Sequence, residues 1–174
     1  MDTVQYSQRQ WQFNERLARI LKLPLRRQAA CVLLAAEMAL PAWKSAETQA
    51  GVDGTADRFI ECFNRWLAGK ASDEELDACS EPLEAALPAD LTKLPDPLPG
   101  MAGFALLDVK LIALGQCEDV HADILTTAVC YAAVAALGGH PSPVRATWNN
   151  LTERQLDLLE AWWRKCSVAV PELR

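Results

Sequence analysis

Glu118 and His121 are the residues of this chain whose types and spacing best suit metal chemistry. They stand three positions apart, the E-x-x-H spacing that places two metal ligands on one helix in di-iron proteins. Such a centre requires a second motif of this kind and further glutamates, whereas the only other histidine, His140, lies in a Gly/Pro turn. We therefore expect neither a metal nor a cofactor in this protein.

The cysteines do not indicate nucleophilic catalysis or disulfides. None forms a C-x-x-C motif, no histidine stands beside one, and most fall in apolar runs where a free thiol behaves as a small hydrophobic side chain. The chain also lacks the G-x-S-x-G, P-loop and H-E-x-x-H motifs. We predict reduced core cysteines in a cytoplasmic protein that is not an enzyme. The cysteines are Cys31, Cys62, Cys79, Cys117, Cys130 and Cys166.

Glu37 is the only acid in an unusually apolar stretch that runs from Ala29 to Leu40. Because an isolated buried carboxylate is costly, we expect Glu37 to pair with an arginine from a neighbouring helix, either Arg58 or Arg27. A structural ion pair between Glu37 and Arg58 is the preferred interpretation. Loss of folding when Glu37 is replaced by alanine would support it, because removing one partner of a buried pair is strongly destabilising.

Asp57, Glu61 and Arg65 follow one another at a spacing of four, which predicts an exposed ladder of i,i+4 charge pairs on one helix. A metal site at Asp53, Asp57 and Glu61 is a weaker interpretation, because acids in a first helical turn usually complement the helix dipole. The alternative function for the chain is a helical enzyme or a small-ligand-binding domain. Its polar cleft would be formed by Glu37, Asp57, Arg58 and His121.

Charge is unevenly distributed along the chain. The sequence has 17 basic and 23 acidic residues, a formal net charge of −6. Residues 1–30 carry six basic and two acidic side chains, so the remainder carries eleven and twenty-one. We expect no nucleic-acid partner, because a phosphate backbone needs a basic face, whereas a basic protein suits this charge. The oligomeric state does not follow from the sequence.

The acidic excess is concentrated between Asp73 and Asp96, where eight acids face one base, Lys93. Such a surface attracts a basic partner and speeds encounter; the alternative is that the acids only keep the protein in solution. We predict that the partner contacts acids of this segment and of the preceding glycine-containing elbow. The candidates are Asp53, Asp57, Glu61, Asp73, Glu74, Asp77, Glu81 and Glu84.

Composition predicts that all-α elements carry these residues. Hydrophobic residues make up 51% of the chain, and alanine and leucine, which favour helix, dominate among them. The length of 174 residues suits one domain, residues 1–174, built as a bundle or array of about seven to eight helices. A proline-rich connection near residues 94–100 divides it internally.

Hydrophobic periodicity sets the first helix boundaries. We predict helices over residues 7–23 and 25–40, and a short helix over 42–49 after an interruption at Pro41. The arginines of the first helix are predicted to form a solvated basic face.

Capping signals set the later boundaries. Asp53 or Thr55 is predicted to cap a helix that Gly69 ends, and capping boxes over 72–75 and 152–155 open two more helices. The remaining helices are predicted over residues 101–114 and 118–137.

No segment is predicted to enter a membrane. The N-terminal sequence MDTVQYSQRQ is polar and has no hydrophobic signal region. The longest apolar run, Ala128 to Leu137, is too short to span a bilayer. We therefore expect no membrane partner.

Short motifs between Arg26 and Leu137 resemble a known family. They are Glu37-Met-Ala-Leu-Pro41, Asp57-Arg58 and Trp66-Leu-Ala-Gly69, with a later alanine-rich helix containing Tyr131-Ala-Ala. The order is similar to that in small all-helical immunity proteins of bacterial polymorphic toxin systems, although their proline-rich loop is glycine-rich here. The resemblance implies a protein that binds and blocks a cognate toxin domain in the cytoplasm of the producing cell.

Overall fold

The computed structural model describes residues 3–50, 54–117, 120–138 and 151–173. Within these ranges the chain forms seven α-helices, two short 3-10 helices and no strand, and it is 83% helical, so the predicted all-α fold is confirmed. The elements are α1 (Thr3–Ile20), α2 (Leu25–Ala50), α3 (Thr55–Leu67), α4 (Asp73–Ala86), η1 (Leu91–Lys93), α5 (Leu98–Ala113), α6 (His121–Leu137), α7 (Glu153–Ala169) and η5 (Pro171–Leu173).

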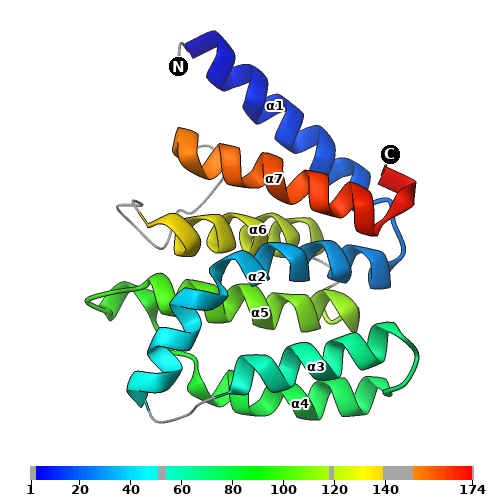
Figure 1. Cartoon of the computed structure of the whole chain (residues 1–174), viewed down its shortest axis with the longest axis vertical. Coiled ribbons are helices and arrows are strands. Elements are labelled where there is room, and N and C mark those ends of the chain that lie inside the picture. Colours follow the sequence, from blue (N-terminus) through cyan, green and yellow to red (C-terminus); the bar gives the residue numbers. More distant parts are fainter. Residues whose placement is uncertain (1–2, 51–53, 118–119, 139–150, 174) are drawn as a thin grey trace.

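The helices stack in successive layers (Figure 1). α1 and α7 lie at one end of the stack, α2, α5 and α6 form the middle, and α3 and α4 lie side by side at the other end. The buried faces of all these helices contribute to one hydrophobic core. The charged helices α1, α4 and α7 are thereby left in the outer layers.

α2 is the central helix of the stack. Its stretch Leu25–Thr48 is long and apolar enough, by length and composition alone, to cross a membrane. In the structure this stretch packs against both α5 and α6, and the α7 residue Trp162 donates its indole N–H to the Cys31 carbonyl at 2.8 Å. A helix covered on several sides by other helices needs such an apolar composition. The expectation of no membrane partner stays a prediction.

Pro41 lies inside α2 and does not end it, so the predicted interruption and the separate helix over 42–49 are wrong. A proline inside a helix removes one hydrogen bond and bends the axis, and Figure 1 shows α2 bending midway. The segment after the bend is held by Trp43, which is 3% exposed and packs against Gly103 of α5. This packing keeps the chain helical beyond the proline.

The first turn of α3 is capped from α2. Gly54 precedes the helix in the left-handed conformation, with φ of 81°, and makes no side-chain cap. Instead, the Glu47 carboxylate accepts hydrogen bonds from the Thr55 hydroxyl and, at 2.9 Å, from the Ala56 N–H. Thr55 is therefore a helical residue and the prediction that it caps α3 is wrong, while the other predicted cap, Asp53, lies outside the described residues.

Both predicted capping boxes form, whereas the bounds of α1 and α5 differ by a few residues from the prediction. The boxes at Ser72–Glu75 and Thr152–Gln155 both form, with reciprocal hydrogen bonds. α5 begins at Leu98 rather than at residue 101, because prolines are tolerated in a first helical turn. α1 begins and ends earlier than predicted, at Thr3 and Ile20.

Candidate partner-binding surface

The α3–α4 layer turns its acids outward because both helices are amphipathic. α3 buries Phe59, Phe63 and Trp66, and α4 buries Leu76 and Leu83. Acids at the other positions of these helices must face solvent. The seven predicted partner-binding acids that the structure describes are all exposed: Asp57, Glu61, Asp73, Glu74, Asp77, Glu81 and Glu84. The eighth, Asp53, lies outside the described residues.

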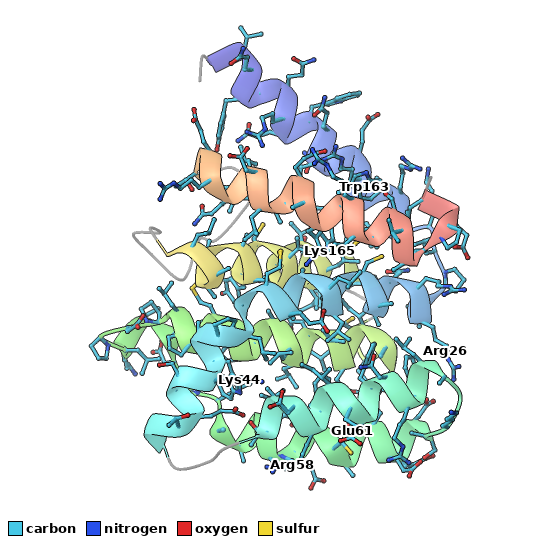
Figure 2. All side chains as sticks on the ribbon, in the orientation of Figure 1. Arg26, Lys44, Arg58, Glu61, Trp163 and Lys165 are labelled. Carbon is cyan, nitrogen blue, oxygen red and sulfur yellow. The ribbon has the colours of Figure 1, made fainter. Side chains whose placement is uncertain are left out.

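The layer as a whole is strongly negative. Between Thr55 and Ala86 the sequence has eight acidic and three basic residues, which gives a formal charge of −5. Figure 2 shows Glu61 and Arg58 in this layer, on the other side of the middle helices from Trp163 of α7. The predicted acids are therefore brought together on two adjacent helices at one end of the molecule.

Lys110 of α5, the helix on which α4 packs, neutralises part of this negative charge. Its side chain is 9% exposed, and its Nζ lies 2.9 Å from Asp77 and 2.7 Å from Glu84. The hydrogen bond from Lys110 is the main reason that the pKa of Glu84 is lowered, and it outweighs the effect of burial. Asp77 and Glu84 therefore fasten α4 to α5 as well as facing solvent.

Two more of the predicted acids have internal partners. Asp57 pairs with Lys44 of α2 at 2.7 Å, and Asp73 accepts a hydrogen bond from the indole N–H of Trp66 at 2.6 Å. Within the described residues, Glu61, Glu74 and Glu81 form no ion pair. These three carboxylates are the part of the surface most available to a partner.

The predicted i,i+4 ion pair between Glu61 and Arg65 along α3 does not form. Arg65 pairs with Glu75 of α4, at 3.5 Å, and not along its own helix. Asp57 and Glu61 instead line a shallow hollow on the outer side of α3, together with Ile60, Asn64, Arg65, Ala68 and Lys70.

Glu37 is exposed on α2, so the expectation that it is a buried charge in need of a partner is wrong. Together with Pro41, it lies on the narrow strip of α2 that its neighbours leave uncovered. In the described ranges Glu37 makes no ion pair with Arg58 or Arg27; Arg27 pairs with Glu172 at 3.6 Å. Glu37 lines neither the hollow on α3 nor the pocket next to Trp43, so the predicted polar cleft around it is not found at either place.

A pocket of 480 Å³ lies at one edge of the acidic layer. It is bounded by the bent half of α2, the end of α4 and the proline-rich connection before α5. Two carboxylates line it: the exposed Asp96, and Glu47, which is only 4% exposed. Burial by itself would raise the pKa of Glu47, but hydrogen bonds from Thr55 and Ala56, together with the Trp43 indole, outweigh it and hold that pKa below its usual value. Glu47 is therefore a buried and ionised carboxylate.

A separate constellation of polar groups surrounds His121. The Cys117 Sγ lies 3.2 Å from His121 Nδ1, and His121 Nε2 lies 2.6 Å from Oε1 of the buried Gln28. The Gln28 amide donates to the carbonyls of Leu21 and Leu23 at 3.3 and 2.7 Å, which fixes Oε1 as an acceptor. His121 Nε2 therefore carries the proton that this contact needs, and the Cys117 thiol has two acceptors within reach, His121 Nδ1 at 3.2 Å and the Leu111 carbonyl at 3.7 Å.

This constellation has the composition of a base-activated nucleophile: a thiol, an imidazole and a group that orients the imidazole. Burial and the nearby Asp108 raise the pKa of Cys117, so the thiol stays protonated until a base accepts its proton. The same hydrogen bonds tie the turn before α2 to the start of α6. The histidine partner Glu118 of the E-x-x-H motif lies outside the described residues, and His140 does too.

All six cysteines are free thiols, and five of them are buried, as predicted. Over the part of the chain that the structure describes, no group of three or more histidines, cysteines and acids is arranged to hold a metal ion. The absence of a metal or cofactor stays a prediction.

Sequence reasoning missed Glu47, Gln28 and the pairing of Cys117 with His121. The sequence did contain a signal for the pairing of Cys117 with His121: a spacing of four residues, which places two side chains on the same side of a helical turn. Gln28 could not have been found from spacing, since 93 residues separate it from His121.

Comparison of the chain with models of protein families, with curated proteins and with solved structures finds no match.

Proposed function

We propose that this protein is an immunity protein that binds a cognate bacterial toxin domain and neutralises it by covering it with the acidic α3–α4 layer. The observation that carries the proposal is the formal charge of −5 on two adjacent outer helices. Three carboxylates of this layer, those of Glu61, Glu74 and Glu81, form no ion pair in the described ranges. The resemblance of the motifs between Arg26 and Leu137 to immunity proteins supports the same function.

In this proposal the protein has no chemistry of its own and acts in the cytoplasm of the producing cell. The toxin domain is basic, so opposite potentials steer the two proteins together and fix their orientation. Exposed charges of this kind contribute more to the rate of encounter than to the lifetime of the complex. Association should therefore slow markedly as salt is added, because the Debye length falls from about 10 Å at 0.1 M to about 3 Å at 1 M.

The test first asks whether a neighbouring gene encodes a toxin domain, and then co-expresses that domain with this protein. Wild-type protein should restore growth, and the double variant Glu74→Lys/Glu81→Lys should bind the purified toxin domain at least tenfold more weakly. The matched control is Glu15→Lys/Glu37→Lys, which makes the same change in net charge at exposed positions of α1 and α2. Equal loss of binding in both double variants, or failure of the wild type to restore growth, would contradict the proposal.

A second candidate function, thiol chemistry, is favoured by one observation: the hydrogen-bonded series Cys117, His121 and Gln28. In it, the Cys117 sulfur would attack an electrophile while its proton moves to His121 Nδ1. The test is the rate of alkylation of each thiol by iodoacetamide, followed by mass spectrometry. Cys117 should react faster than the more exposed Cys79, and His121→Ala should abolish this difference. If Cys117 reacts more slowly than Cys79, the hydrogen bonds among Cys117, His121 and Gln28 have only a structural role.

A further inference from the structure

The bend in α2 and two glycines of α5 create the pocket at the edge of the acidic layer. After the bend, Trp43 lies so close to α5 that a Cβ at Gly103 would approach its ring to 2.5 Å. A Cβ at Gly100 would likewise approach Leu91 to 2.3 Å and Pro88 to 3.0 Å. Glycine at both positions therefore allows the tryptophan and the proline-rich connection to lie against α5, with the pocket of 480 Å³ between them.

The walls of this pocket are mostly apolar, and both of its charged side chains are acidic; Ser45 and the Trp43 indole are its uncharged polar groups. Prolines, leucines and alanines form most of the surface, Glu47 and Asp96 contribute carboxylates, and none of the lining residues is basic. Glu47 is ionised although it is 4% exposed. A fixed negative charge beside apolar walls favours a cation that carries an aliphatic stem.

The Trp43 indole lies beside the buried Glu47 carboxylate in this pocket. The Trp43 side chain is 3% exposed, and although its buried indole Nε1 meets no acceptor in full hydrogen-bond geometry among the described residues, the indole helps to hold the pKa of Glu47 down. Because the benzene edge of the ring packs against Gly103, the opposite edge, which bears Nε1, faces away from α5. Buried N–H groups are rarely left without an acceptor. The Glu47 carboxylate, four residues further along α2, is the acceptor within reach of this edge, and the indole adds to the contacts that keep Glu47 ionised.

We propose that this pocket receives a lysine or arginine side chain of the basic protein partner, with the cationic group at Glu47 and Asp96 and the stem along the proline-rich wall. This inference rests on the proposed function and gives the binding surface an anchor. Arginine in a well-packed pocket is a common energetic centre of interfaces, surrounded by charges that contribute less. The volume lies within the roughly 300–1,000 Å³ of known ligand pockets.

The first experiment needs no partner. The protein is titrated with n-butylguanidinium chloride, and the indole N–H signals of the six tryptophans are followed in ¹H–¹⁵N spectra, with Trp43→Phe identifying the signal of Trp43. We expect this signal to shift and saturate, while n-butanol and sodium butyrate at matched ionic strength leave it in place. No shift, or an equal shift with n-butanol, would overturn the proposal.

Variants then connect the pocket to the probe. Ala46→Leu fills the pocket from α2, and Asp96→Asn removes one charge while keeping the acceptor that Asp96 offers to the Leu98 N–H. Both variants should weaken n-butylguanidinium binding, the first by at least tenfold. Asp90→Asn is the matched control, because Asp90 holds a similar backbone hydrogen bond outside the pocket. A control that weakens binding as much as Asp96→Asn would contradict a specific site.

The toxin domain supplies the final step. Ala46→Leu should weaken its binding at least tenfold, with a smaller dependence on salt than the effect of Glu74→Lys/Glu81→Lys. If the double variant loses the toxin domain and Ala46→Leu does not, the anchor is wrong and the acidic surface stands. If the wild type binds no toxin domain, the proposed function fails, and with it the partner assigned to the pocket.

Discussion

The two outer layers of the molecule both carry many charges, but they use them differently. Between Thr3 and Gln28 the sequence has six basic residues and one acid, and α1 directs three of its arginines onto the C-terminal part of the chain. Arg9 pairs with Asp157 at 2.8 Å, Arg16 pairs with Glu160, and Arg19 donates to the Leu173 carbonyl. The predicted solvated basic face is therefore only partly found: Arg9 and Arg16 are partly covered by α7, whereas Arg19 is exposed.

The α3–α4 layer shows the opposite balance. Its acids outnumber the bases within reach, so that Lys44, Lys110 and Arg65 satisfy some of them and Glu74 and Glu81 form no ion pair with another described residue. Charge content alone does not separate these two cases. What separates them is whether the neighbouring helix carries the opposite charge. Charges that find a partner within the chain stabilise the packing of helices, and the excess is what a second protein can use.

Asp108 gives the sharpest test of this rule, because it is nearly shielded from water and forms no hydrogen bond or ion pair with another residue that the structure describes. It lies on α5 and is 7% exposed, and burial raises its pKa to about 7. A carboxyl group whose folded pKa is raised favours the folded state while it is protonated, so this contribution is lost as the pH rises from 3.8 to about 7. The difference corresponds to about 4 kcal/mol of unfolding free energy.

Asp108→Asn should therefore be more stable than the wild type at pH 8 and should lose this dependence on pH. Urea unfolding followed by circular dichroism at several pH values measures both effects. Asp123→Asn, at an exposed position of α6, is the control and should leave the slope unchanged. A variant that is less stable than the wild type at pH 8 would show that the Asp108 carboxylate has an unrecognised stabilising contact.

Lys110 tests the acids that serve packing. Lys110→Met should destabilise the protein by about 2 kcal/mol, less than for a fully buried pair because Asp77 and Glu84 are about half exposed. The lowered pKa of Glu84 contributes stability above its unfolded pKa of 4.5, and this is lost as the pH falls through the folded value. The unfolding free energy of the variant should therefore fall less steeply than that of the wild type as the pH is lowered. Wild-type stability in Lys110→Met would mean that the α4 acids do not fasten the layer.

These cases show how far sequence reasoning reaches in this protein. The all-α fold and both capping boxes were predictable, because helix propensity and caps act over a few residues. The exposure of Glu74 and Glu81 was predictable from the amphipathic pattern of α4. The position of Glu37 was not, since α2 is so rich in alanine that its period does not reveal which strip stays uncovered.

Contacts between distant segments explain the other misses. The continuity of α2 through Pro41 depends on the fit of Trp43 against Gly103, and the cap of α3 depends on Glu47 of the preceding helix. Local rules for proline and for capping cannot anticipate a group supplied from another helix. The same holds for Lys110, whose two acidic partners lie on α4. The pairing of charges, and hence their excess, is a property of the packed helices.

The smallest effect is expected where a single charge of the α1–α7 layer is removed. Arg16 pairs with Glu160 and lies 5.5 Å above the Trp163 ring, so Arg16→Ala should lower the unfolding free energy by about 1 kcal/mol, the sum of a partly exposed ion pair and a cation–π contact. Arg16→Lys keeps the charge and should recover part of this loss. Glu81→Ala is the comparison in the other layer and should leave thermal unfolding unchanged, because Glu81 is exposed in the middle of α4 and forms no ion pair with the rest of the described chain. Should Glu81→Ala destabilise the protein as much as Arg16→Ala, the two layers would use their charges alike, and the acidic excess of α4 would be part of the fold.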